Sequence, residues 1–199
     1  MSAAPRNGDR WHHATAGKDR QRQASHRERV VLIVTTPFLD LVEQQFAPST
    51  GIESHGVQHG VLVLHLEPAA LLPVAERLKS QFAFDLFLDV TAIDWPDDAL
   101  RFEVVHHFYS TTHKVRVRLK TRVSASDPTV DTLTSLFGSA GYMERECHDM
   151  YGIVFRGNDD LRPILLYEGF SGHPLRKDYP KQLEQPLVPY RPPQGTLVR

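Results

Sequence analysis

The sequence lacks the motifs of a stand-alone enzyme. Its single cysteine, Cys147, excludes an intramolecular disulfide and any iron–sulfur or zinc site built from cysteines of this chain alone. It contains no HExxH motif, no GxSxG motif and no glycine-rich phosphate loop. We therefore expect no catalytic, cofactor-binding or metal-binding residue, although several acid, base and ligand groups gather near the C-terminus: Glu144, Glu146, His148, Asp149, Tyr151, His173 and Asp178.

Long apolar runs and an excess of charge of either sign are absent as well. No run approaches about 18 apolar residues, so nothing is expected to span a bilayer, and the N-terminus lacks the apolar core of a secretory signal. A formal net charge of -1 and a pI near 6.8 argue against a dedicated nucleic-acid binder. Any association with a membrane should then be indirect, through other proteins.

Aliphatic side chains are almost missing from residues 1–29, which are rich in arginine. Such a composition predicts a disordered polar tail, because too little apolar surface is available to offset the entropy lost on ordering. An organelle transit peptide is the alternative, and the acidic residues Asp9, Asp19 and Glu28 weaken it.

Residues 30–155 show the alternating patterns of one α+β domain. Strands are predicted at 30–34, 61–66, 84–90, 101–109 and 113–121, the last two joined by a hairpin-sized connection. Short helices are predicted from Pro37 to Phe46, from Pro68 to Phe82, and over 131–137, whereas 51–60 looks turn-rich. This order of elements predicts a single domain with a mainly antiparallel sheet flanked by short helices.

One predicted strand carries a basic row, since Lys114, Arg116, Arg118 and Lys120 alternate with apolar residues. Binding of a nucleic acid would begin on such a row, but single-strand binders add exposed aromatic side chains for base stacking, and this row has none. A solvated face, or one that meets an acidic protein partner, is the better interpretation.

A further amphipathic helix is predicted over 142–151 and should end at Gly152. Its spacing places Glu146 and Asp149 on one surface, where two like charges repel unless water or cations compensate them. The following segment supplies four cations, so we expect ion pairs between the helix and Arg156, Arg162, Arg176 or Lys177.

Residues 156–199 form the third predicted region, an ordered but irregular arm. Glycines and prolines recur along it without the period of a helix or a strand. An arm of this length cannot satisfy its own backbone polar groups, so it should lie along a protein surface. We expect that surface to belong to partner subunits.

The C-terminal motifs resemble those of one known family. The runs Glu144-Arg145-Glu146, Asp149–Ile153, Asp160–Arg162 and Gly172–Pro180 are similar to the signature of the C subunit, or 30 kDa subunit, of bacterial NADH:quinone oxidoreductase, respiratory complex I. The likeness extends upstream through Asp89–Trp95 and covers about the last two thirds of the chain.

The resemblance implies a non-catalytic subunit in the peripheral arm of a proton-translocating enzyme that transfers electrons from NADH through FMN and iron–sulfur clusters to quinone. Those cofactors would sit in partner subunits, with none in this chain. The expected partners are the D-type subunit of the quinone pocket and the cluster-bearing B-type subunit, on the cytoplasmic side of the bacterial inner membrane. Interface and arm-fixing roles would fall on Glu144, Arg145, Glu146, Asp149, Gly152, Arg162, Gly172, His173, Pro174, Arg176, Lys177 and Asp178.

Two departures from the family pattern stand out. Tyr142 takes the place of a common tryptophan, and Gly157-Asn158-Asp159 replaces a common Gly-His-Pro, so that a rigid proline and a ring are lost. The same module resembles subunits of membrane-bound nickel–iron hydrogenases and formate hydrogenlyases, which gives the alternative function.

Overall fold

A computed structural model describes residues 37–46, 51–182 and 185 of the chain. The predicted tail, the predicted strand at 30–34 and the end of the predicted arm lie outside these residues. The domain boundaries placed after residues 29 and 155 therefore stay predictions.

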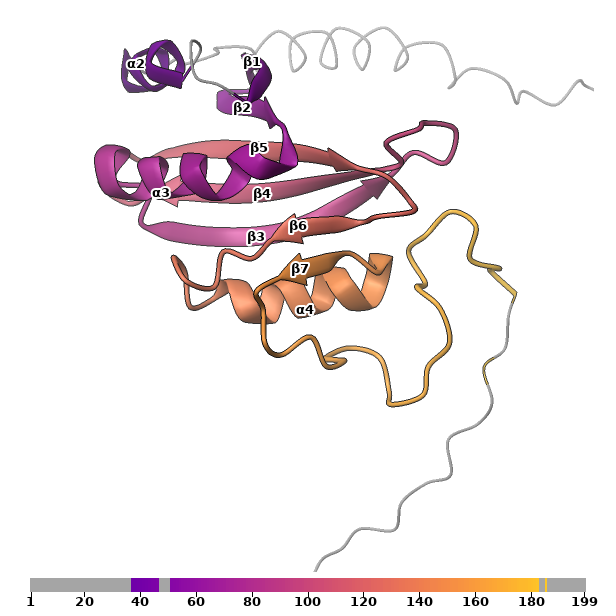
Figure 1. The fold of residues 1–199 in the computed structure, drawn as a ribbon. Coiled ribbons are helices and arrows are strands. Elements are labelled where there is room, and N and C mark those ends of the chain that lie inside the picture. Colours follow the sequence, from indigo (N-terminus) through magenta and orange to yellow (C-terminus); the bar gives the residue numbers. More distant parts are fainter. Residues whose placement is uncertain (1–36, 47–50, 183–184, 186–199) are drawn as a thin grey trace, which may run out of the picture. The chain divides into compact units, whose positions relative to one another are not determined.

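The described chain is built around a five-stranded sheet (Figure 1). Along the sheet the strands follow the order β1-β2-β5-β4-β3, and only β2 and β5 are parallel among these neighbours. The prediction of a mainly antiparallel α+β domain is confirmed. The bounds are β1 Ile52–Gln58, β2 Val61–Leu66, β3 Leu86–Asp94, β4 Phe102–Ser110 and β5 Val115–Val123.

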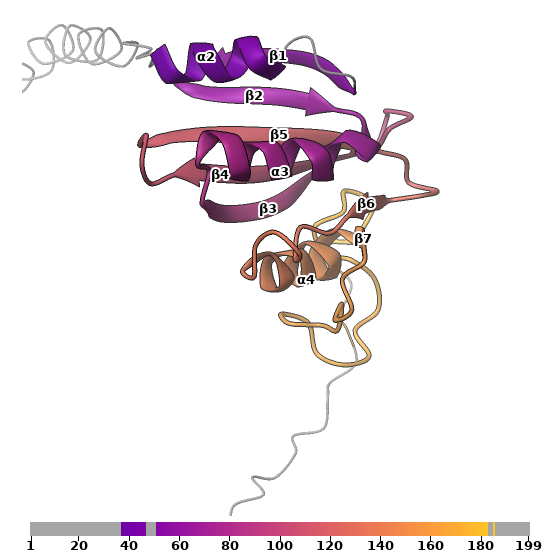
Figure 2. The same ribbon diagram turned by 60° about the vertical axis from the view of Figure 1, so that its left-hand side comes forward.

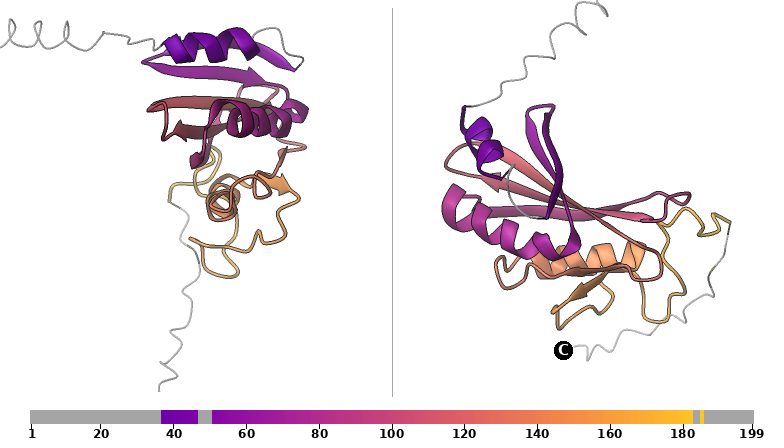
Figure 3. Two further views of the ribbon diagram at one scale, coloured as in Figure 1. Left: turned by 90° about the vertical axis from the view of Figure 1, so that its left-hand side faces the viewer. Right: turned by 45° about the horizontal axis from the view of Figure 1, so that its top comes forward.

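Three helices contribute their apolar side chains to one cluster with the inner face of this sheet: α2 (Pro37–Phe46), α3 (Leu71–Phe82) and α4 (Ala140–Tyr151). A 3-10 turn, η2 (Pro68–Ala70), leads into α3. Helices α3 and α4 lie on the same side of the sheet (Figure 3). The predicted stripe of α3 is confirmed, since Leu71, Val74, Ala75 and Leu78 are all buried.

Two short parallel strands, β6 (Thr129–Asp131) and β7 (Val154–Arg156), form a second small sheet next to α4 (Figure 2). The helix predicted over 131–137 is wrong. Its first residue ends β6, and the rest form turns in which the Leu133 carbonyl accepts the backbone N–H groups of Leu136 and Phe137. Leu133 and Phe137 of this segment are both buried in the core.

Two further predictions need correction at the sheet edges. Residues 52–58 form the edge strand β1 and not a series of turns; its side chains are mostly polar because none of them is buried. In β3 a bulge between Phe87 and Asp89 shifts the alternation. Phe87 consequently points into the core, whereas Leu86 is 42% exposed, so the simple alternation expected over 84–90 does not hold.

The predicted hairpin is confirmed as β4 and β5, joined by residues 111–114. Lys114 lies in that connection, with φ 58°, and therefore does not continue the basic row of β5. The row on the strand itself consists of Arg116, Arg118, Lys120 and Arg122.

Candidate functional site

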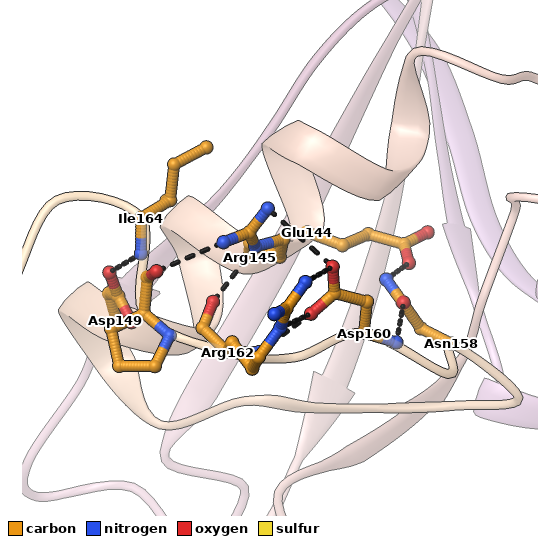
Figure 4. Close-up of polar contacts among 8 residues, drawn as sticks. Glu144, Arg145, Asp149, Asn158, Asp160, Arg162 and Ile164 are labelled. Carbon is orange, nitrogen blue, oxygen red and sulfur yellow. Dashed lines mark hydrogen bonds and ion pairs between the residues drawn. The ribbon is translucent and has the colours of Figure 1, made fainter. Parts of the chain in front are cut away.

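Helix α4 and the segment that follows β7 form one unit, which we call the α4–arm unit (residues 140–182). The predicted helix end is confirmed, because Gly152 adopts the left-handed conformation with φ 72° and donates its N–H to the His148 carbonyl at 2.7 Å. Most of the signature residues fall within this unit, and Figure 4 shows several of them meeting between the helix and the arm. The side chains on α4 point in different directions, and each of them binds a different part of the chain.

Glu144 points into the protein and is fully buried. Its carboxylate accepts hydrogen bonds from the Thr132 hydroxyl at 2.6 Å and the Leu133 N–H at 2.8 Å. It also accepts one from the Asn158 amide at 2.8 Å, which Figure 4 shows. Burial raises the pKa of Glu144, and the three donors offset this only in part. The side chain thus ties the turn before α4 to the start of the arm.

Asp149 is the main attachment point of the arm. Its Oδ2 atom accepts the consecutive backbone N–H groups of Ile164 at 2.8 Å, Leu165 at 2.9 Å and Leu166 at 3.2 Å. Burial alone would raise the pKa of Asp149, but these donors outweigh it and hold the pKa below its usual value. A carboxylate enclosed by main-chain donors fixes the path of an otherwise irregular segment.

Arg145, a cation, binds the carbonyl groups of the arm next to the N–H groups that Asp149 binds. Its guanidinium donates to the carbonyls of Arg162 at 2.8 Å and Pro163 at 3.0 Å (Figure 4). Arg162 itself contributes only its backbone to this contact, since its side chain is exposed and pairs with Asp160 at 2.7 Å.

The C-terminal end of α4 is capped by the arm. The His173 ring donates from Nδ1 to the Asp149 carbonyl at 2.9 Å, and Arg176 donates from Nε to the Tyr151 carbonyl at 2.6 Å. Such donors satisfy carbonyls that have no partner within the helix. Gly152 allows this contact, because a Cβ there would collide with the side chains of Arg176 and His173.

The last described part of the arm returns to the main sheet. The Lys177 N–H donates to Asp94 Oδ2 at 2.7 Å, and Arg101 bridges Asp94 at 2.6 Å and Asp178 at 2.8 Å. Arg101 holds the pKa of Asp94 below its usual value. Gly172 has φ 91° and packs against the Tyr179 ring, and the half-buried Pro174 follows in the same bend.

The prediction that Glu146 and Asp149 pair with cations of the arm is wrong. Asp149 is bound by main-chain N–H groups, and Glu146 is exposed, with no ion pair inside residues 37–46 and 51–182. The arm cations have other partners, as Arg156 shows by pairing with Asp131 at 2.6 Å. Backbone donors are available wherever the chain turns, so a buried carboxylate does not require a cation.

Several residues of the site were missed from the sequence, notably Asp94, Arg101, Thr132 and Asn158. Asn158 stands at the departure from the family pattern, where its side-chain oxygen accepts the Asp160 N–H at 3.0 Å while its amide binds Glu144. This Asx turn supplies the local rigidity that a proline would otherwise give. These residues contact partners 12 or more positions away in the sequence, so local spacing could not predict the contacts.

A cavity of about 170 Å³ lies between the end of α4 and the arm. His148 and His173 line it together with Leu166, Tyr167 and Phe170. The Nδ1 atom of His148 bonds to the Ile153 carbonyl at 2.8 Å, as that of His173 does to Asp149. Within the described ranges, no group of three or more His, Cys, Asp or Glu side chains could hold a metal ion.

Chemically, the α4–arm unit is suited to contact with another protein. Cys147 is buried, and burial raises the pKa of its thiol, which disfavours the thiolate that a nucleophile requires. The arm directs apolar side chains outward from a firmly bonded backbone: Ile164, Leu165, Tyr167 and Leu175 are 37–60% exposed. For the described residues, no helix has the length and hydrophobicity needed to cross a membrane.

Comparison with known proteins agrees with the motifs. Residues 64–185 match the family described as respiratory-chain NADH dehydrogenase, 30 Kd subunit. The C subunit of NADH-quinone oxidoreductase from Xanthobacter autotrophicus is 44% identical over 126 residues, which are 62% of this chain and 60% of that protein. The protein of the same name from Cereibacter sphaeroides is 44% identical over 131 residues, 65% of each. The chain therefore spans less than two thirds of the length of these relatives.

Solved structures show the same fold. A trypsin-resistant fragment of Nqo5 is 30% identical, with a TM-score of 0.53 over 62% of this chain and 99% of the fragment. A chain of an archaeal membrane-bound sulfane sulfur reductase gives a TM-score of 0.63 over 72% of this chain and 86% of its own. At 23% identity the latter likeness concerns the fold alone.

Proposed function

The chain belongs to the family of the 30 kDa subunit of respiratory-chain NADH dehydrogenase, and from this premise we propose that it is the non-catalytic, peripheral C subunit of a bacterial NADH:quinone oxidoreductase. The observation that carries the proposal is the family match over 64–185, which includes most of the sheet, α4 and most of the arm. The relatives favour this enzyme over the hydrogenase-type alternative.

In this proposal the chain works by position and not by chemistry. The holoenzyme would carry electrons from NADH through FMN and iron–sulfur clusters to quinone and translocate protons, with every cofactor in a neighbouring subunit. The D-type subunit of the quinone pocket and the B-type, cluster-bearing subunit are the proposed partners, at the cytoplasmic side of the inner membrane. What supports a docking role is an arm whose backbone is fixed by Asp149 and Arg145 while its apolar side chains face outward.

The signature residues then divide into two proposed roles. Glu144, Arg145, Asp149, Gly152, Gly172, His173, Pro174, Arg176, Lys177 and Asp178 would fix the arm, whereas the exposed Glu146 and Arg162 would face a partner. A fixed arm has lost its conformational entropy before it binds, so less of the binding free energy is spent on ordering it.

Affinity purification tests the proposal. The full chain is tagged, membranes are solubilised in mild detergent, and the proteins that copurify are identified by mass spectrometry. We expect flavin- and NADH-binding subunits together with D-type and B-type subunits. A nickel-binding large subunit without the NADH-binding subunits, or recovery of the chain as a monomer, would contradict the proposal.

A further inference from the structure

The side of the sheet that faces away from α3 and α4 has a character of its own, and we call it the open face. On it lie alternate side chains of β2, β5 and β4: Val63, His65, Glu103, Val105, His107, Tyr109, Arg116, Arg118, Lys120 and Arg122. Val63 and Val105 are only 1% and 4% exposed, yet they do not belong to the core cluster that the helices cover. Across the sheet Val63 lies beside Arg118 and Val105 beside Lys120, long side chains that can pack apolar stems on the sheet with their charged ends outward.

Two of the four cations on this face are already paired. Lys120 binds Glu103 at 2.9 Å and Arg122 binds Asp98 at 2.6 Å. Their charges are therefore offset within the chain, and they contribute little to attracting another molecule.

Arg116 and Arg118 differ, because neither has a carboxylate partner among the described residues. Arg116 is exposed and lies over the Tyr109 ring, while the Nε atom of Arg118 is buried without a hydrogen-bond partner in the described part of the chain. The neighbouring His107 does not add to this positive charge, since burial and then Arg118 lower its pKa and favour its neutral form. The centre of the open face thus holds two guanidinium groups whose charge is not compensated.

We infer that the open face binds an acidic segment of a neighbouring subunit, whose carboxylates pair with Arg116 and Arg118. The inference rests on the proposed function, which supplies neighbouring subunits. Arg116 and Arg118 are two residues apart on one strand, so their side chains stand roughly 7 Å apart. Carboxylates two residues apart on an extended segment, or about 5–6 Å apart at adjacent turns of a helix, fit that spacing.

The chemistry of the open face favours a segment of another protein with discrete carboxylates. The chain's own residues 1–29 contain more arginine and lysine than aspartate and glutamate, so they do not complement a basic face. Asp89 is exposed on β3 beside His107, and Lys120 and Arg122 are already paired with carboxylates of this chain. The open face therefore lacks the continuous positive charge that a polyanion such as a nucleic acid requires. Bidentate pairing of guanidinium with carboxylate is also the strongest geometry that these residues offer.

Charge-matched variants test the inference in the tagged full chain. Arg116→Gln/Arg118→Gln removes two positive charges from the open face, and Gln44→Glu/Gln45→Glu adds two negative charges on exposed positions of α2, so both change the net charge by the same amount. We expect the first variant to copurify the other subunits at least about tenfold less than wild type, with a weaker dependence on salt. The second should match wild type. Equal copurification of all three proteins would overturn the inference.

A zero-length carbodiimide cross-link identifies the occupant. Arg116→Lys/Arg118→Lys keeps both charges and places a reactive amine where each guanidinium was, so a paired carboxylate becomes covalently joined to it. We expect cross-linked peptides that contain an aspartate- or glutamate-rich segment of another subunit. Cross-links only within this chain or to a second copy would refute the inference. The inference would also be refuted if Arg116→Gln/Arg118→Gln abolished binding of the chain to anionic vesicles but left copurification of the other subunits at the wild-type level.

The proposed function and the acidic contact can fail separately. If the wild-type chain copurifies no subunit of an NADH:quinone oxidoreductase, the proposed function fails. If wild type and the Gln variant copurify the same subunits equally, the proposed function stands and the acidic contact on the open face is refuted.

Discussion

Helices α3 and α4 pack on the same side of the sheet with different chemistry. The buried residues of α3 are all apolar, whereas two of the four buried residues of α4 are carboxylates, Glu144 and Asp149. Helix α3 is held by the exclusion of water from its side chains, which any apolar neighbour of suitable shape provides. Helix α4 is held by hydrogen bonds to named donors, which come from turns and from the arm.

The difference shows what each helix does in the chain. An apolar stripe tolerates exchange of one apolar residue for another, so α3 serves stability in general. A buried carboxylate is costly unless its donors arrive, so α4 and the arm must fold together. The arm is thereby held in place by directional hydrogen bonds, as the proposed docking role requires.

The largest effect is expected for Glu144→Ala. The change leaves the Thr132 hydroxyl, the Leu133 N–H and the Asn158 amide without their acceptor in a buried site, and removes buried side-chain volume. We expect the free energy of unfolding to fall by about 4 kcal/mol, as measured by urea denaturation. Glu146→Ala, on the exposed side of the same helix, should change it by less than about 0.5 kcal/mol. Equal effects of the two changes would show that the hydrogen bonds of the buried carboxylate do not hold α4.

Leu78→Ala makes the corresponding change in α3. Leu78 is fully buried in the core cluster, so its truncation should cost about 3 kcal/mol. The loss should be global, leaving hydrogen exchange in the arm unchanged relative to the rest of the protein. Selective exposure of the arm in this variant would show that α3 also fixes it.

Asp149→Asn should act locally. The amide keeps one acceptor oxygen but loses the charge that strengthens three hydrogen bonds, at a cost of about 2 kcal/mol. We expect the amides of Ile164, Leu165 and Leu166 to exchange faster and the arm to be cleaved sooner by protease, while the sheet is unaffected. Uniform acceleration across all elements would argue that Asp149 stabilises the whole domain and not the arm.

A dependence of stability on pH also separates the inner face of the sheet from α4. Burial of His106 on β4 lowers its pKa to about 3. The unfolded chain, with a histidine pKa of about 6.5, then binds a proton that the folded chain does not, so stability falls by about 1.4 kcal/mol per pH unit as pH decreases between these values. Asp149 has a lowered pKa, so its contribution is lost only below the usual aspartate range.

His106→Leu checks this assignment. The variant should lose part of the decline in stability between about pH 6 and pH 4.5, measured by urea denaturation at each pH. His107 and His173 also have lowered pKa values, so a smaller decline of the same sign should remain. Parallel curves for wild type and variant would contradict the assignment to His106.

The sequence predicted the parts of the fold that depend on local pattern. The stripe of α3, the strand β2, the β4–β5 hairpin and the end of α4 at Gly152 were all evident, because apolar period and glycine conformation act over a few residues. The C-terminal motifs also indicated the family, since so long a joint pattern is specific.

What the sequence did not predict depends on partners far along the chain. The burial of Glu144 depends on Thr132 and Asn158, which lie 12 and 14 residues away, and that of Asp149 on residues 15 to 17 away. The bulge in β3 and the polar edge strand β1 follow from strand pairing, and no local period records them. The spacing of Glu146 and Asp149 therefore suggested one charged surface, although Asp149 is buried and only Glu146 is exposed.

The parallel pairing of β2 with β5 has a consequence for synthesis of the chain. Leu62 pairs with Val117, so the ribosome must release more than fifty further residues before β2 gains its second neighbour. Until then the β1–β2 hairpin is an isolated two-stranded element, which is at best marginally stable in water. The five-stranded sheet is complete only after β5 has emerged from the ribosome, and α4 and the arm are synthesised after β5. In a nascent chain the arm is thus made after all the strands of the main sheet, on which it comes to rest.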